Sequence, residues 1–151
     1  MKNIVFAGFL AIISIFGLSG HASAEAPIYT GLFSNNAVGG YDTVSYFMGD
    51  GVPVKGSKKF QTKWNGANWL FSTQENLDKF KASPKKFAPQ YGGYCAWAAA
   101  HETLAKGDPK NYHIQNGKLY LNYDANIHKQ WLPRRAELIP VADAQYPKLL
   151  Q

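Results

Sequence analysis

Two Asn-Gly dipeptides constrain the fold of this chain more than any other sequence feature. Asn65-Gly66 and Asn116-Gly117 each lie between two short runs that are rich in apolar and aromatic residues. Asn-Gly tolerates the positive φ angles of a two-residue hairpin turn, so each dipeptide predicts an antiparallel β-hairpin. The predicted strand pairs are Phe60–Trp64 with Asn68–Phe71, and Tyr112–Gln115 with Lys118–Tyr123.

One helix is expected directly after the first hairpin. Ser72-Thr73-Gln74-Glu75 has the pattern of a capping box, in which Ser72 caps the first turn and Glu75 returns a hydrogen bond. Leu77 and Phe80 supply an apolar stripe. Ser83-Pro84 is expected to end the helix, because the residue before a proline avoids the helical region.

Further helices are expected in the C-terminal half. The alanines of Tyr94–Glu102 favour one helix. Asp124 is a candidate N-cap for a second helix over Ala125–Trp131. Pro133 is expected to break that helix, and Arg134–Gln145 is expected to form a terminal helix.

The fold class follows from the order of these elements. The β-branched and aromatic residues of Thr43–Met48 predict one more strand. The sequence shows no internal repeat and no low-complexity tract, and 151 residues is the size of one domain. Two antiparallel hairpins with three to four helices between and after them predict a small single-domain α+β fold, not a βαβ sheet.

The first residues have the three-part pattern of a secretory signal peptide. Lys2 supplies a positive charge, Ile4–Leu18 is an uncharged and mostly apolar run, and Ala22-Ser23-Ala24 places small residues at a cleavage site. We expect cleavage after Ala24, because the apolar run is short for a membrane span of about 20 residues. No later stretch is apolar enough to span a membrane, so we expect a periplasmic or secreted mature protein. The expected organisation is a signal peptide at 1–24, an extended lead-in at 25–36, a domain at 37–131 and a C-terminal helical extension packed on it at 132–151.

The chain is basic, with 16 Lys and Arg against 10 Asp and Glu and a formal net charge of +6. Loss of Lys2 with the leader lowers the charge to +5. The lysines are scattered through the predicted hairpins and the first helix, without an arginine-rich arm or an interleaved aromatic ladder. This pattern is typical of a solvated surface and argues against a nucleic-acid partner.

Cys95 is the only cysteine of the chain. A single cysteine excludes a disulfide framework, an all-cysteine zinc site and a CxxC redox motif. Cys95 follows Gly92-Gly93 at the expected start of a helix, where unpaired amides and the helix dipole favour a thiolate. On a helical wheel, His101 lies with Trp97 on a different face from Cys95. The alternative is a buried cysteine that acts only as a small apolar side chain.

The mature chain has few side chains that suit a soft metal ion. Thiolate, thioether and imidazole ligands favour Cu(I), and only tertiary structure can assemble them here, because no local metal-binding motif is present. Asp42, beside a glycine turn, is the acidic residue that we single out, with a turn hydrogen bond as its alternative role. The soft donors are Cys95, Met48, His101, His113 and His128, of which Cys95, His101, His113 and Met48 are the predicted metal ligands.

Five ordered motifs run through the mature chain: Gly40-Tyr41-Asp42-x-Val44-x-Tyr46-Phe47, Trp64-x-Gly66-x-x-Trp69-x-Phe71, Pro89-Gln90-Tyr91-Gly92-Gly93-Tyr94-Cys95-Ala96, Gly107-Asp108-Pro109 and Gly117-Lys118-Leu119-Tyr120-Leu121-Asn122-Tyr123. Together they resemble the exported YHS-domain proteins, and the resemblance covers about Ala37 to Trp131. It implies a YHS-like fold. Some members of this subgroup carry selenocysteine at the position of Cys95, which implies redox or soft-metal chemistry at this residue.

The wider YHS family is associated with heavy-metal handling and occurs appended to copper-transporting ATPases. Those metal-linked domains use additional cysteines that this sequence lacks, so a copper site here needs His or Met from elsewhere in the fold. Tyr112-His113 stands where the family often has Trp, which makes His113 a peculiarity of this chain.

Three functions agree with these observations. The preferred one is an exported binding module in which Cys95 binds a soft metal such as a copper ion, helped by a histidine or Met48. The second is a thiol-redox protein, which as an enzyme would be a thiol-dependent oxidoreductase, in which Cys95 attacks a peroxide or a disulfide and an external thiol resolves the product. The third is a non-catalytic domain with an inert Cys95 that binds a periplasmic protein partner. The residues expected to line the site are Asp42, Tyr91, Gly92, Gly93, Tyr94 and Trp97.

Overall fold

The computed structural model describes residues 24–151, so the predicted signal peptide lies outside the described residues except for Ala24. The described chain forms three two-stranded antiparallel sheets and four α-helices, which confirms the α+β prediction. The strands are β1 (Tyr41–Asp42), β2 (Val54–Lys55), β3 (Ser57–Trp64), β4 (Ala67–Phe71), β5 (Asp108–Gln115) and β6 (Lys118–Asn122), and the helices are α1 (Gln74–Ala82), α2 (Pro84–Phe87), α3 (Ala96–Ala100) and α4 (Ala125–Leu149).

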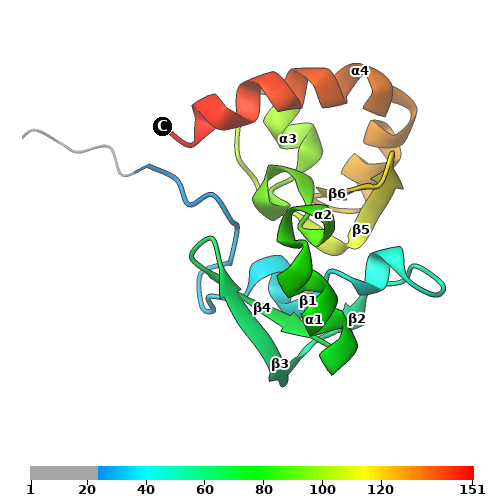
Figure 1. The fold of residues 1–151 in the computed structure, drawn as a ribbon. Helices are drawn as coiled ribbons and strands as arrows, with labels where there is room; N and C mark the ends of the chain where they lie inside the picture. Colours follow the sequence, from blue (N-terminus) through cyan, green and yellow to red (C-terminus); the bar gives the residue numbers. More distant parts are fainter. Residues whose placement is uncertain (1–23) are drawn as a thin grey trace, which may run out of the picture.

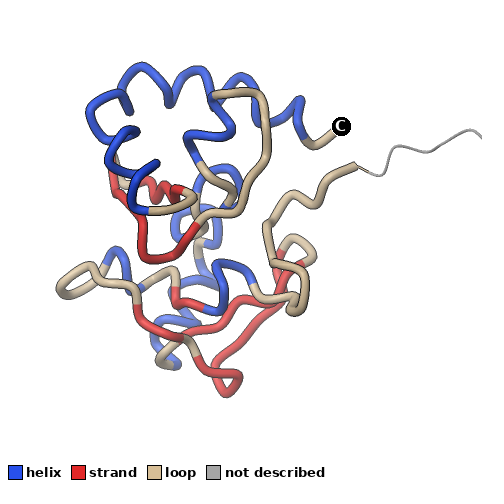
Figure 2. Tube along the Cα trace, turned by 180° about the vertical axis from the view of Figure 1, so that it is seen from behind, coloured by secondary structure: helices blue, strands red, loops and turns tan. Residues whose placement is uncertain are grey.

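The elements are arranged in two tiers (Figures 1 and 2). The lower tier in Figure 1 holds β1 to β4 and α1, the upper tier holds β5, β6, α3 and α4, and α2 lies between them. Each tier has its own apolar cluster, which includes Trp69 and Phe80 in the lower tier and Tyr120 and Trp131 in the upper tier. Strand β6 contributes to both clusters, because Tyr120 packs in the upper one and Leu121 in the lower one.

Both predicted hairpins are present, as β3–β4 and β5–β6. The turn residues have the positive φ angles that the Asn-Gly pattern implies, +46° at Asn65, +79° at Gly66, +52° at Asn116 and +70° at Gly117. The third sheet, in which β1 pairs with β2, was not predicted, because two residues per strand leave no recognisable pattern in the sequence.

The predicted strand over Thr43–Met48 is wrong. The strand ends at Asp42, and a 3-10 turn follows over Ser45–Phe47. Asp42 Oδ1 accepts hydrogen bonds from the backbone N–H groups of Val44 (2.9 Å) and Ser45 (3.3 Å), and these bonds bend the chain directly after β1. The apolar residues of this segment are therefore a sign that it is buried, and they do not indicate a strand.

The N-cap of α1 is Thr73. The capping-box pattern predicted Ser72, so this prediction is wrong by one residue. Thr73 Oγ1 accepts a hydrogen bond from Asn76 N–H at 3.1 Å. The Ser72 hydroxyl is engaged elsewhere, because it donates to Asp42 Oδ2 at 2.6 Å. The predicted end of this helix at Ser83-Pro84 is confirmed, and the proline then serves as the first residue of α2.

Helix α3 is shorter than the predicted helix over Tyr94–Glu102. Cys95 has an extended backbone and stands at the N-cap, and Glu102 has a left-handed φ of +57°. The extended conformation of Cys95 and the left-handed conformation of Glu102 are both incompatible with an α-helix, so they limit its length at the two ends.

Helix α4 runs through Pro133, so the predicted break there is wrong, whereas the predicted Asp124 cap is confirmed. Pro133 is exposed and removes one helical N–H. Trp131 before it and Leu138 after it are both buried in the upper cluster, and this packing holds the helix together across the proline. Figure 1 shows α4 curving over α3 toward the C-terminus.

The two tiers repeat the same backbone order, which we call the first repeat (37–87) and the second repeat (90–149). Each repeat begins with a Gly-Gly turn, Val38–Gly40 or Tyr91–Gly93, and all three residues of each turn have positive φ angles. In both turns the carbonyl oxygen of the second glycine accepts a hydrogen bond from a later glycine, Gly56 (2.9 Å) in the first and Gly107 (3.1 Å) in the second. The two turns are thus built in the same way.

The hairpins that follow these turns also correspond. The strand pairing shifts register between Ser57 and Gln61 in β3 and at the matching place, between Asp108 and Tyr112, in β5. The helix after each hairpin begins at an N-cap whose side chain accepts a hydrogen bond from the backbone three residues later. The backbone conformation therefore repeats although the sequence does not, because most of the paired side chains differ.

Candidate functional site

Cys95 lies at the N-cap of α3 with its side chain inside the upper tier. It is a free thiol, and its exposed fraction is 1%. Its backbone N–H donates to Ala105 O (2.9 Å), and its carbonyl oxygen accepts from Ala99 N–H (3.0 Å). Its backbone also forms a parallel bridge with Leu121 of β6. The predicted position at a helix start is confirmed, and the residue is fixed on both sides.

The backbone N–H groups of Ala98, Tyr123 and Trp97 surround the Cys95 sulfur and favour its anionic form, and we call this group the amide nest. Burial raises the pKa of the Cys95 thiol, and the amide nest opposes this shift without cancelling it. The resting side chain is therefore a protonated thiol at neutral pH, surrounded by groups that stabilise its anion.

Asn122 connects Cys95 to a histidine. The Cys95 thiol donates to Asn122 Oδ1 at 3.9 Å, and Asn122 Nδ2 lies 3.2 Å from His128 Nδ1. Burial and the nearby charge of His113 lower the pKa of His128, so its imidazole is neutral at pH 7. A neutral Nδ1 can accept the hydrogen bond from Asn122 Nδ2. The Cys95 thiol, the Asn122 amide and the His128 imidazole therefore form one hydrogen-bonded chain.

Asp42 takes the place of Cys95 in the first repeat. Its Oδ1 accepts from the backbone N–H groups of Val44 (2.9 Å) and Ser45 (3.3 Å), and its Oδ2 accepts from Ser72 N–H (2.8 Å). These are the three backbone positions that form the amide nest of Cys95 in the second repeat. The same arrangement of N–H groups therefore holds a carboxylate in one repeat and a thiol in the other.

The surroundings of the two side chains differ beyond the backbone. Asp42 Oδ2 also accepts from the Ser72 hydroxyl (2.6 Å) and from Asn76 Nδ2 (2.8 Å). Tyr123 and Ile127 stand at the matching positions of the second repeat, and no hydrogen bond from their side chains reaches Cys95. Both carboxylate oxygens of Asp42 thus accept hydrogen bonds from backbone and side-chain donors. At Cys95, the corresponding positions contribute backbone N–H groups alone.

His101 points away from Cys95. It is exposed, its Nδ1 lies 2.7 Å from Trp97 O, and its ring stacks on the Trp97 ring at 4.5 Å between centroids. The helical wheel placed His101 with Trp97 on a face apart from Cys95, and the stacking of the two rings confirms that pairing.

In the described part of the chain, the other predicted ligands form no hydrogen bond with the sulfur and contact different partners. His113 packs edge to face on Trp131 at 6.0 Å, and Met48 Sδ lies 3.9 Å from Lys79 Nζ in the lower tier. Within residues 24–151, no group of three or more His, Cys, Asp and Glu side chains is placed to hold a metal ion. The histidine that hydrogen bonds link to Cys95 is His128.

The residues predicted to line the site hold neighbouring segments in place. Tyr91 OH donates to Asp143 Oδ1 of α4 (2.9 Å), and Tyr94 OH donates to Ala26 O (3.0 Å). The Gly92 carbonyl oxygen accepts a hydrogen bond from the lead-in segment at 3.0 Å. The lead-in and α4 therefore close around the second Gly-Gly turn, which leaves the sulfur enclosed.

Sequence reasoning missed Asn122, whose Oδ1 accepts a hydrogen bond from the Cys95 thiol at 3.9 Å. It is fully buried at the end of β6, where Phe71 stands in the first repeat. The sequence does show a polar residue at the end of an apolar strand. It does not show that this residue contacts Cys95, because that contact depends on the tertiary fold.

Comparison with known families identifies one match. The family profile of the YHS domain matches residues 46–91, which supports a YHS domain-containing protein. The matched region covers much of the first repeat and ends before Cys95. Comparisons with curated proteins and with solved structures found no match. Among residues 24–151, no helix has the length and apolar character needed to cross a membrane.

Proposed function

We propose that the protein is an exported YHS-domain module that handles a soft metal ion of the copper type through Cys95. The observation that carries the proposal is the amide nest, which stabilises a negative charge on the sulfur and whose counterpart holds the Asp42 carboxylate. A metal ion displaces the thiol proton, and the nest then supports the thiolate ligand. The leader pattern at residues 1–24 supports export.

The donor set around Cys95 fits a soft cation with few ligands. Cu(I) favours thiolate and imidazole. Cys95 and His128 would hold the ion, since both contact the same Asn122 side chain and the lowered pKa of His128 keeps its imidazole in the form that binds metals. Binding releases the Cys95 proton, so the affinity rises with pH until the thiol is ionised.

A competition titration tests this function. Reduced mature protein competes for Cu(I) with a chromophoric chelator, first as wild type and then as Cys95→Ser and His128→Leu. We expect both variants to lose most of the affinity and His101→Gln, which alters an exposed imidazole, to retain it. Wild-type affinity in Cys95→Ser would contradict the proposal.

Thiol oxidation is a second candidate, favoured by the ability of the nest to bind oxygen anions, as Asp42 shows in the first repeat. The Cys95 thiolate attacks a hydroperoxide, the S–O bond forms as the O–O bond breaks, and the departing oxide takes a proton. Sulfur is oxidised to a sulfenate and the peroxide is reduced to water or an alcohol. An external thiol then forms a mixed disulfide and releases the oxygen as water.

Intact mass after peroxide treatment tests this second candidate. We expect wild-type protein to gain one or two oxygen atoms at Cys95, and Cys95→Ser to gain none at that residue in peptide mapping. Because the resting thiol is protonated and buried, the reaction should be slow and should accelerate as pH rises. A wild-type Cys95 that takes up neither oxygen nor Cu(I) would instead support an interaction domain with an inert cysteine.

A further inference from the structure

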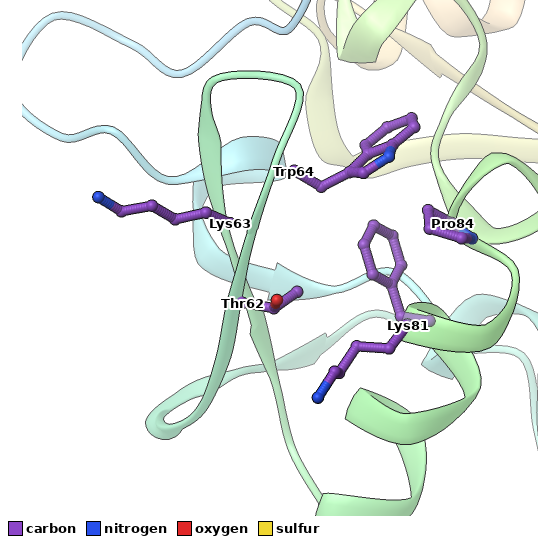
Figure 3. Close-up of a pocket in the computed structure, with 6 residues that line it drawn as sticks. Thr62, Lys63, Trp64, Lys81 and Pro84 are labelled. Carbon is purple, nitrogen blue, oxygen red and sulfur yellow. The ribbon is translucent and has the colours of Figure 1, made fainter.

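A cavity of about 180 Å³ lies between β3 and α1 in the first repeat, in the tier that does not contain Cys95. Figure 3 shows Trp64 and Pro84 on its upper side and Thr62 and Lys81 on its lower side, while Lys63 extends outward from β3. The lining residues are Thr62, Lys63, Trp64, Phe80, Lys81 and Pro84.

Two aromatic side chains, Trp64 and Phe80, form part of the wall of this cavity and are held in place. Trp64 meets Phe80 edge to face, with 5.9 Å between ring centroids and 87° between ring planes. The backbone of Trp64 is fixed as well, because its carbonyl oxygen accepts a hydrogen bond from Trp69 Nε1 at 2.9 Å. An apolar cavity of about 150 Å³ holds a benzene ring. The space beside Trp64 measures about 180 Å³ and is partly open to solvent, so it has room for one aromatic ring against Trp64.

The charge around the cavity is positive. Lys63 and Lys81 are both exposed at its edge, and no Asp or Glu lines it. Lys85 lines a second hollow that shares Trp64, and that hollow also has no carboxylate. A carboxylate on the nearby helix, Glu75, is paired with Lys79 at 2.6 Å. An anionic group at the mouth of the cavity thus meets lysines that no acidic residue of the lining neutralises.

The second repeat closes the matching space with its own side chains. Arg135 of α4 reaches across to β5, where its Nε donates to Gln115 Oε1 at 2.6 Å, and its guanidinium also donates to Leu132 O. Gln115 matches Trp64 in strand position, and Trp131 matches Phe80 in the helix. Arg135 stands at the position of Pro84, so its hydrogen bond to Gln115 spans the region that corresponds to the open cavity of the first repeat.

We propose that the open cavity of the first repeat binds a single-ring aromatic carboxylate. The ring lies between Trp64 and Pro84, and the carboxylate faces the Lys81 ammonium group at the mouth. This site is separate from Cys95 and does not depend on the chemistry proposed there.

Titration of the mature protein with benzoate tests the proposal. We expect saturable changes in the amide signals of Thr62 and Lys81 and in the Trp64 indole signal in a two-dimensional NMR spectrum. Benzamide, which keeps the ring and lacks the charge, should bind more weakly, and acetate, which lacks the ring, should leave the Trp64 signal unchanged. Absence of a saturable change with benzoate, or equal binding of benzamide, would overturn the proposal.

Single substitutions test separately how the Lys81 charge and the open space of the cavity contribute to benzoate binding. Lys81→Gln should weaken benzoate binding by about fivefold, a typical effect for an exposed charge. Lys118→Gln, which removes an exposed lysine from the corresponding hairpin of the second repeat, should bind as wild type does. Thr62→Phe fills the cavity and should abolish binding while the circular dichroism spectrum and the thermal midpoint show a folded protein. Binding retained by a folded Thr62→Phe, or lost equally in Lys118→Gln, would contradict the assigned site.

Discussion

Asp42 and Cys95 stand at the same point of the two repeats, each facing three backbone N–H groups from matching positions. Two forces act on the charge of each side chain. Burial disfavours an anion, and converging N–H groups favour it. Additional donors from Ser72 and Asn76 reach Asp42, whereas burial dominates at Cys95 and keeps a thiol there. The site around Cys95 can therefore hold a sulfur anion, which forms when a metal ion displaces the thiol proton or when the pH rises.

Replacement of Cys95 by aspartate should be tolerated better than replacement by leucine. The carboxylate of Cys95→Asp can accept hydrogen bonds from the amide nest, so we expect a loss of about 2 kcal/mol in the free energy of unfolding. Cys95→Leu leaves those N–H groups without an acceptor and adds volume to a packed interior, with an expected loss of about 4 kcal/mol. Urea unfolding measures both values, and the reverse order would contradict a nest that accepts anions.

Loss of the Asp42 side chain should destabilise the first repeat strongly. Asp42 is fully buried and accepts hydrogen bonds from Val44, Ser45, Ser72 and Asn76. Asp42→Ala leaves these donors without a partner, which should cost about 3 to 5 kcal/mol in chemical denaturation. Asp50→Ala, at an exposed turn, serves as the control and should lie within about 0.5 kcal/mol of wild type.

The lowered pKa of His128 predicts that stability falls in acid. His128 titrates near 6.5 in the unfolded chain and lower in the folded protein. Below the unfolded value the unfolded state binds more protons, so the free energy of unfolding decreases as the pH falls. Burial and Arg135 lower the pKa of His113, which adds to the same trend.

Urea midpoints measured from about pH 8 to about pH 5 should show this decline. His128→Leu should reduce the slope, because leucine stands at the matching position of the first repeat, Leu77, and does not titrate. His101→Gln should leave the slope as in wild type. An unchanged slope in His128→Leu would show that other groups cause the acid sensitivity.

Gly92→Ala should release the lead-in segment. Gly92 has a φ of +61°, and a Cβ built there would lie 1.9 Å from Pro27 O. Gly117 has a similar φ of +70° but no heavy atom within 4 Å of its Cβ position, so Gly117→Ala isolates the backbone strain. We expect a loss of about 1 kcal/mol for Gly117→Ala and about 3 kcal/mol for Gly92→Ala. Limited proteolysis near Pro27 should accelerate in Gly92→Ala alone.

Local signals predicted the elements whose backbone is set by neighbouring residues. The Asn-Gly turns place both hairpins correctly, and Asp124 marks the start of α4. The errors occur where a distant partner intervenes. Ser72 leaves its expected capping role because it bonds to Asp42, and α4 continues through Pro133 because buried contacts on both sides hold it.

Local sequence patterns predicted the α+β class, the hairpins and the single cysteine at a helix start, because turn chemistry, alternation and composition act over a few residues. The folded chain adds three relationships that these patterns do not contain. Its backbone repeats, Asp42 and Cys95 are counterparts, and His128, not His101, is linked to the sulfur through Asn122. These relationships join residues far apart along the chain, and they arise when each tier folds and excludes water from the groups buried within it.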